Sequence, residues 1–356
     1  MTSPTSKPSN ALIQLAAFVV VVAGMKAASS LVVPFLLAIF LAIICTPLLF
    51  WLKSRKIPGL LGLLLILGIV GGLWLLLAMV IGSTLAEFSR NVPYYQDRLS
   101  LITREILHIL ADQGFSIDSA KLEELLNPGK IMLFAAGLLN SLGGMVTNAF
   151  VILLTFVFLL LEAAGIPDKL RAVSGRSNGS LDQYVSITAG VNRYLAIKTI
   201  TSIATGGAVY MLLSVQKVDF VILWALLAFL LNFIPNIGSI LAAIPAVLLS
   251  LIQLGPAQAA VSAIGFLLIN IIIGSIIEPR AMGRGIGLST LVVFLSLAFW
   301  GWVLGPVGML LSVPLTMTVK IALGERDETR WIALLLGSNK EVSAYLNLQK
   351  RSETVE

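Results

Sequence analysis

Long, uninterrupted apolar blocks constrain this chain more than any other feature of its sequence. A soluble core cannot bury them, because 58% of the 356 residues are hydrophobic and only 12% are charged. The excess must face lipid, where only helices or closed barrels satisfy their own backbone groups, and the blocks lack the alternation of barrel strands. The sequence therefore predicts an all-α, polytopic helical membrane protein with about eight transmembrane segments. The blocks fall at about residues 11–25, 31–52, 60–86, 145–163, 195–215, 218–252, 257–277 and 289–323.

Basic residues in the short loops predict the orientation of these segments. The turn at 53–56, the connection 165–193 and the turn 278–287 carry lysine or arginine and are expected in the cytoplasm. Alternate threading of the blocks then places both the N-terminus and the C-terminus in the cytoplasm. We interpret the first two blocks as a tight helical hairpin of two retained spans and not as a signal peptide.

The blocks and the polar stretches between them divide the chain into segments. We expect a three-span membrane region at 1–86, and a fourth span with a cytoplasmic connection at 145–194. Residues 195–323 are expected to form the transport region, and residues 324–356 a cytoplasmic tail. Between the first two lies an extracytoplasmic (periplasmic) amphipathic helical region at 87–144, interpreted as a cap that rests on the membrane or on a neighbouring subunit.

The sequence lacks the signatures of an enzyme, a metal site or a nucleic-acid surface. The net charge is +6, but the basic residues lie between apolar blocks and do not gather on one polar module. Cys45 and His108 are the only residues of their types, so no set of histidine or cysteine ligands exists. No hydrolase, phosphate-binding or redox motif occurs. We therefore expect no catalytic residue, no metal, no cofactor and no nucleic-acid partner.

Two blocks, 218–252 and 289–323, have lengths that fit neither one span nor two. Each has about 35 residues, whereas one span needs about 20 and two spans with a turn need about 42. Proline and glycine interrupt each block near its middle, around Pro235 and Pro306. These breakers are compatible with re-entrant helical hairpins that have short arms, and equally with two tightly packed full spans. The two blocks also resemble each other at an offset of about 70 residues, and on this threading they enter the membrane from opposite sides. That is the layout of an inverted repeat, and chance similarity between apolar stretches is the alternative.

Polar residues around the breakers are the candidate solute site. An unpaired amide in apolar surroundings costs several kcal/mol, so each needs a partner, either freed backbone or a hydroxylated ligand. No acid lies in mid-span, which suits a neutral polar solute better than a metal ion or a proton relay. The expected substrate-binding residues and hairpin tips are Asn232, Pro235, Asn236, Gly238, Ser239, Asn270, Trp300, Gly301, Gly305 and Pro306.

A compact charged turn follows the block at 257–277. We interpret it as a gating hinge in which an acid and two arginines form an ion pair, or else as a solvated turn. Two further charged residues that border apolar blocks, Lys198 and Glu162, are candidates for ion coupling. The hinge residues are Glu278, Pro279, Arg280, Gly283 and Arg284.

Three stretches, Asn232–Ser239, Glu278–Arg284 and Trp300–Thr316, resemble the signature stretches of the bacterial autoinducer-2 exporter family. The resemblance covers essentially the whole chain and is closest to members named for transport of a quorum-sensing signal. It implies a cell inner-membrane protein that exports autoinducer-2, a small, neutral and hydroxyl-rich molecule, and a homo-oligomer, suspected to be a pentamer. Because some relatives are described as sodium/proton antiporters, cation/proton antiport stays open, as does a membrane scaffold or receptor.

Overall fold

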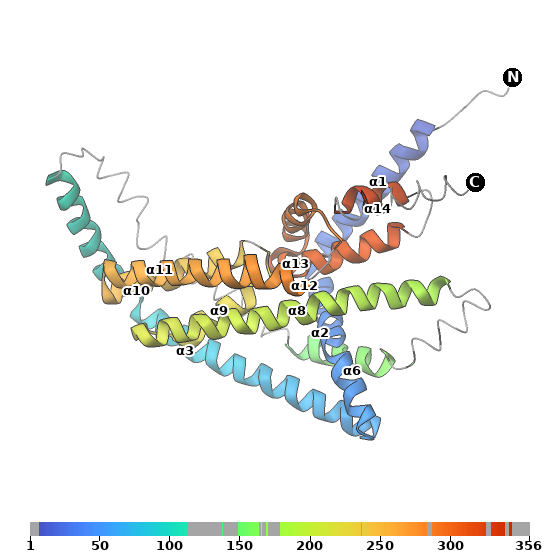
Figure 1. Cartoon of the computed structure of the whole chain (residues 1–356), viewed down its shortest axis with the longest axis horizontal. Helices are drawn as coiled ribbons and strands as arrows, with labels where there is room; N and C mark the ends of the chain where they lie inside the picture. Colours follow the sequence, from blue (N-terminus) through green and yellow to red (C-terminus); the bar gives the residue numbers. More distant parts are fainter. Residues whose placement is uncertain are drawn as a thin grey trace. The chain divides into compact units, whose positions relative to one another are not determined.

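The structure, a computed structural model, is helical almost throughout the residues that it describes. These are 7–112, 137, 149–163, 165, 169, 179–235, 237–282, 287–324, 329–338 and 342–343. Within them the only β-type pairing is an isolated bridge between Leu288 and Gly337. The helices are α1 (Lys7–Ala27), α2 (Ser29–Ser54), α3 (Gly59–Asp112), α6 (Ala149–Ala163), α8 (Gly179–Gln216), α9 (Val221–Leu231), α10 (Gly238–Leu254), α11 (Pro256–Ile269), the π-helix η1 (Asn270–Ile277), α12 (Glu278–Met282), α13 (Thr290–Gly324) and α14 (Arg330–Leu336) (Figure 1).

Five helices in this described part are long and apolar enough to cross a membrane, so the expected polytopic all-α fold is confirmed. They are Ser29–Ser54, Gly59–Thr84, Ala189–Gln216, Pro256–Met282 and Thr290–Gly324. Four shorter apolar helices accompany them, namely Leu15–Ala27, Ala149–Glu162, Val221–Leu231 and Gly238–Leu254. By length alone, the segments expected from hydropathy divide into helices of at least 26 residues and helices too short to cross alone. The longest of them, Thr290–Gly324, is interrupted at Gly305.

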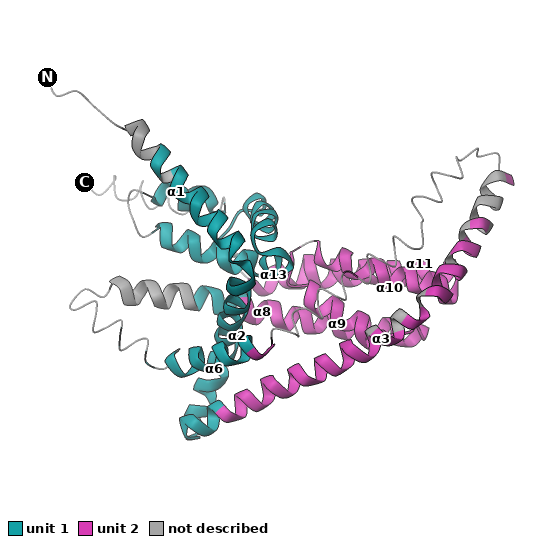
Figure 2. Ribbon diagram, turned by 180° about the vertical axis from the view of Figure 1, so that it is seen from behind, with its two compact units in different colours: residues 1–63, 151–194, 284–356 teal, residues 64–150, 195–283 magenta. Residues whose placement is uncertain are grey.

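Tertiary contacts divide the chain into two compact units that interleave along the sequence. Unit 1 comprises residues 1–63, 151–194 and 284–356, and unit 2 comprises residues 64–150 and 195–283 (Figure 2). The two blocks expected to form hairpins, both within the predicted transport region, belong to different units. The segment boundaries expected from hydropathy stay a prediction.

Helices α1 and α2 do not form the tight hairpin expected from the first two blocks. Only Ala28 separates them, with a φ of −92° and a ψ of 15°. Helical hydrogen bonds continue through the junction, from Ala28 N to Gly24 O at 2.9 Å and from Val32 N to Ala28 O at 3.0 Å. The two helices thus follow each other end to end (Figure 1). The interpretation was wrong because the residues between the blocks include no glycine or proline that would end a helix.

Helix α3 is much longer than the span expected at 60–86, since it runs without interruption to Asp112 and has 54 residues. At 1.5 Å per residue its length is about 80 Å, against a hydrocarbon core of about 30 Å. The start of the amphipathic helical region expected at 87–144 is therefore a continuation of the membrane span, with Pro93 inside it. The rest of that region, except for Gly137, lies outside the described residues.

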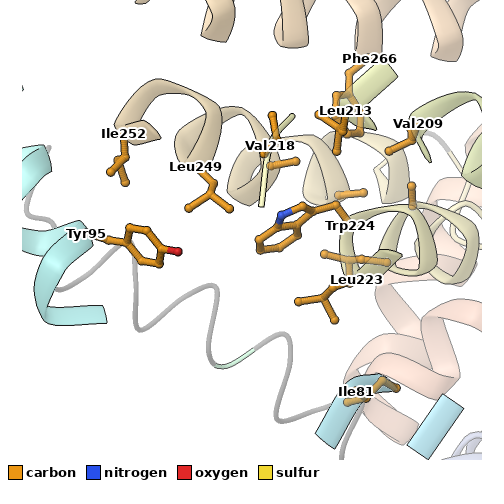
Figure 3. Close-up of a cluster of buried hydrophobic side chains, with 14 residues drawn as sticks. Ile81, Tyr95, Val209, Leu213, Val218, Leu223, Trp224, Leu249, Ile252 and Phe266 are labelled. Carbon is orange, nitrogen blue, oxygen red and sulfur yellow. The ribbon is translucent and has the colours of Figure 1, made fainter. Parts of the chain in front are cut away.

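The core of unit 2 gathers around Trp224 of α9, which is 1% exposed and donates its indole N–H to the Asp219 carbonyl at 3.0 Å. Tyr95 of α3 is equally buried and belongs to the same cluster of buried side chains as Leu249 and Ile252 of α10 (Figure 3). Burial, aided by the nearby Asp219 carboxylate, raises the pKa of Tyr95 to about 12, so the phenol stays neutral. The core thereby attaches the outer part of α3 to the α9–α10 pair.

Candidate functional site

Helices α9 and α10 form the first hairpin, which lies in unit 2. At its open end the Asp219 backbone N–H donates to Gln253 Oε1 at 3.0 Å, although 34 residues separate the two. The Gln253 side-chain amide also donates to the Asp219 carboxylate. The arms have 11 and 17 residues, so they are about 16 and 25 Å long, shorter than the hydrocarbon core of about 30 Å. These lengths favour the short-armed hairpin over two full spans.

The turn of the first hairpin is tight because Gly238 brings the two arms into direct contact. A Cβ atom at Gly238 would lie 1.7 Å from the carbonyl oxygen of Leu231, the last residue of α9. Within the turn, Gly238 N donates to Ile234 O at 3.2 Å and Ile237 N donates to Pro235 O at 2.7 Å. The breaker residues of this block therefore lie in a turn, as their chemistry favours.

Helix α13 folds back on itself at Gly305 and forms the second hairpin, in unit 1. Gly305 has a φ of 69° and a ψ of −152°, a conformation that only glycine adopts readily. Trp300 donates its indole N–H to Thr316 Oγ1 at 3.0 Å, although 16 residues separate the two. In a continuous helix these residues would lie about 24 Å apart along the axis. The arms, 290–304 and 306–324, are about 22 and 28 Å long.

The two turns share one local geometry. A Cβ atom at Gly308 would lie 1.9 Å from the Trp300 carbonyl oxygen, as a Cβ atom at Gly238 would lie 1.7 Å from that of Leu231. In both hairpins a glycine early in the second arm contacts the backbone near the end of the first arm. The sequence similarity between the two blocks therefore corresponds to a structural feature that occurs in both, the close approach of a glycine to the backbone of the first arm.

A polar cavity of about 170 Å³ lies beside the turn of the first hairpin. Four parts of unit 2 line it: α8, the turn after α9, the start of α10, and the continuous helix made of η1 and α12. Most of its lining residues carry a side-chain polar group, although the helices around it are predominantly apolar. The lining residues are Lys198, Asn232, Ile234, Pro235, Ser239, Asn270, Gly274, Ser275 and Glu278.

An ion pair between two membrane helices lies at this cavity. Lys198 Nζ donates to Glu278 Oε1 at 2.7 Å, and the two side chains are 4% and 14% exposed. Thr201 Oγ1 lies 3.5 Å from the second oxygen of the Glu278 carboxylate. One charge at the centre of a span costs about 2.5–3.5 kcal/mol on insertion scales, and pairing offsets that cost for both groups. The two side chains are directed at each other.

The partner of Glu278 differs from the one expected. The sequence suggested an ion pair with the arginines of its own turn, but Arg280 is exposed and residues 283–286 lie outside the described part. Residues i and i+2 of a helix do not face each other, so Arg280 of α12 is directed away from Glu278. Lys198, 80 residues earlier in the chain, takes its place.

The amide of Asn232 is satisfied within unit 2, because its Nδ2 donates to Ser202 Oγ at 3.0 Å and both residues are buried. Its partner is a hydroxyl of α8, whereas the sequence suggested freed backbone or a ligand. Asn270 begins the π-helix η1, and π-helical turns occur frequently at functional sites. The sequence analysis missed three cavity residues, Ile234, Gly274 and Ser275. The last two follow Asn270 at helical spacing, and that spacing was the available signal.

The other predicted site residues lie elsewhere. Trp300, Gly301, Gly305 and Pro306 are in unit 1, at the turn of the second hairpin, whereas the polar cavity is within unit 2. Glu162 forms an exposed ion pair with Lys169, and Pro279 is exposed beside Arg280. Asn236, Gly283 and Arg284 lie outside the described residues. Of the two candidates for ion coupling, only Lys198 therefore lies at the cavity.

Comparison with known proteins places the whole chain in one group. The family model described as AI-2E family transporter matches residues 15–326. A protein of Haemophilus influenzae, named for transport without a stated substrate, is 42% identical to this chain. The aligned region covers 92% of this chain and 95% of that protein. The AI-2 transport protein TqsA of Escherichia coli is 40% identical over 93% of this chain and 96% of its own length. The chain therefore belongs to the AI-2E family of transporters and is a multi-pass membrane transport protein.

Proposed function

We propose that this protein exports a small, neutral, hydroxyl-rich solute, autoinducer-2, across the bacterial inner membrane, and that the polar cavity of unit 2 is its binding site. The observation that carries the proposal is the lining of that cavity. It combines an amide, hydroxyls, an ammonium and a carboxylate within otherwise apolar membrane helices. A polyol both donates and accepts hydrogen bonds, so each of these groups can pair with it. The similar protein TqsA is named for AI-2 transport, which agrees with this choice of solute.

The Lys198–Glu278 ion pair would serve as the gate of this site. Hydroxyls of the solute would compete with the Lys198 ammonium for the Glu278 carboxylate, to which the ammonium donates at 2.7 Å. Opening of the pair would then loosen α8 from α12 and allow the first hairpin to move, since its turn lines the same cavity. We further propose that both hairpins are re-entrant, that both termini are cytoplasmic, and that the protein is a homo-oligomer, with a pentamer as the working stoichiometry.

Cation/proton antiport is the second candidate function, and the same ion pair is the observation that favours it. A buried carboxylate between membrane helices can bind a proton or a small cation once its lysine partner leaves. In that case Lys198 would act as a tethered cation that exchanges with the transported one. A membrane scaffold or receptor has less support, because the family and the named relatives are transport proteins.

Flux measurements in sealed vesicles separate the two candidates. Proteoliposomes that contain the protein should release loaded autoinducer-2 in a saturable manner, with or without a sodium or proton gradient. Ser239→Ala should slow this flux about threefold to tenfold, because a hydrogen bond to the solute is lost. The matched control Ser214→Ala changes an exposed serine of α8 that does not line the cavity, and it should leave flux unchanged. Sodium-driven proton movement without any flux of autoinducer-2 would instead establish antiport.

A further inference from the structure

We infer that the site of unit 2 has two compartments and accepts an amphiphile, whose hydroxylated head occupies the polar cavity and whose short alkyl chain lies in an adjoining apolar groove. This inference rests on the proposed function, in that the polar cavity is taken as the solute site. It extends the substrate class from wholly polar solutes to those that carry a short apolar chain on the same hydroxylated head.

The groove is a cavity of about 400 Å³ between helices α10 and α11, larger than the polar cavity. Its walls are apolar side chains except at one place, where Ser239 and Asn270 contribute. These same two residues also line the polar cavity, so the two spaces meet there. Its lining residues are Ser239, Ile240, Ala243, Ile244, Val247, Leu248, Ala263, Phe266, Leu267 and Asn270.

Small side chains keep the groove open. Ala243 of α10 and Ala263 of α11 both line it, and larger residues at either position would fill the space by the interdigitation usual between packed helices. The neighbouring part of the same helix pair is closed, because Ser262 Oγ donates to Ser250 Oγ at 3.0 Å. The groove is therefore a local opening in an otherwise packed pair, and it ends at the polar residues of the site.

The arrangement selects for a particular ligand. The polar cavity supplies hydrogen-bonding groups for a hydroxylated head, and the groove supplies only apolar contacts. A chain of a few carbons attached to the head would extend from Ser239 and Asn270 along α10 and α11. Each methylene moved from water into apolar surroundings improves binding about fourfold. A hexyl chain has about five methylenes more than a methyl group, and burial of only about three of them in the groove should already tighten binding at least about 50-fold.

Protection of an introduced cysteine tests this inference. Cys45 is the only cysteine, so a Cys45→Ala, Ser239→Cys variant in lipid nanodiscs reports on the point where the two spaces meet. We expect hexyl β-glucoside to slow labelling by a hydrophilic thiol reagent at a concentration about 50-fold lower than methyl β-glucoside does. Adding Ala243→Phe should remove this dependence on chain length, whereas adding Val261→Phe, at an exposed position of α11 outside the groove, should keep it.

The outcomes separate the inference from the function on which it rests. Equal protection by the two glucosides, or a dependence on chain length that survives Ala243→Phe, overturns the inference. Should Ala243→Phe not fold, Ala263→Leu from the opposite wall replaces it. Labelling could also be blocked in the absence of any glucoside and appear only when each nanodisc holds one protomer. That result would show that a second copy of the chain fills the groove, and it would also overturn the inference. Flux of autoinducer-2 by the unaltered protein, measured in parallel, tests the proposed function independently.

Discussion

Replacement of Lys198 by methionine should reduce solute flux at least about 100-fold, because Glu278 then keeps a buried carboxylate without its partner. Removal of one member of a buried ion pair typically costs about 3–5 kcal/mol, and the two side chains are only 4% and 14% exposed. Glu278→Gln should be similarly damaging, since Lys198 would retain an unpaired charge. The measurement is the initial flux in proteoliposomes, normalised to the amount of folded protein recovered after reconstitution.

The double variant Lys198→Met, Glu278→Gln distinguishes a gate from a coupling site. It removes both charges and leaves neither unpaired, so a gate that serves only to hold two helices together should recover part of its flux. A site that exchanges a cation or a proton should stay inactive, because its charge is required for every cycle. The exposed pair of Glu162 and Lys169 provides the matched control, and Lys169→Met should change flux less than twofold. Wild-type flux in Lys198→Met would contradict the proposed gate.

Alanine at Gly238 should abolish the folded first hairpin. The new Cβ atom would lie 1.7 Å from the Leu231 carbonyl oxygen, far inside any real contact, and the obstacle is backbone that no side-chain rotation can move. We expect the yield of monodisperse protein to fall at least about tenfold, as when a core is overpacked beyond repair. Gly308→Ala should have the same effect on the second hairpin, since its Cβ would lie 1.9 Å from the Trp300 carbonyl oxygen.

Two helical glycines without neighbours provide the control for these variants. A Cβ atom at Gly207 of α8 or at Gly68 of α3 would meet nothing within 4 Å. Alanine there should leave the yield unchanged or raise thermal stability slightly, because alanine favours a helix by about 1 kcal/mol over glycine. Fluorescence-detected size-exclusion chromatography after a heat step compares all four variants. If Gly238→Ala were as stable as Gly207→Ala, the arms of the first hairpin would have to be separated at this point.

Local sequence chemistry predicted the hairpins better than it predicted the partners of charged residues. Proline and glycine act on their own backbone, so Pro235 and Gly305 marked the turns without any knowledge of neighbours. The partner of Glu278 lies 80 residues away on another helix, and no pattern within its own turn could identify it. The same reason explains Ser202 as the partner of Asn232.

Element boundaries failed where the sequence contains no breaker. Polar residues after the first block suggested a turn. These residues are compatible with a helix, and helical hydrogen bonds therefore continue through Ala28 from α1 to α2. Helix α3 likewise continues beyond its apolar part, and Pro93 does not end it. Hydropathy reports where a helix can lie in lipid, whereas the end of a helix depends on backbone chemistry and packing.

The sequence by itself determined that this protein is a helical membrane protein with two interrupted apolar blocks, because burial in lipid and backbone breaking are properties of each residue. It also identified most polar residues of the site, since a polar group within an apolar block is conspicuous. Only the tertiary structure decided which of them meet, through the ion pair of Lys198 with Glu278 and the cavity that adjoins a groove at Ser239 and Asn270. Such meetings depend on how distant helices pack, and packing is a property of the whole fold.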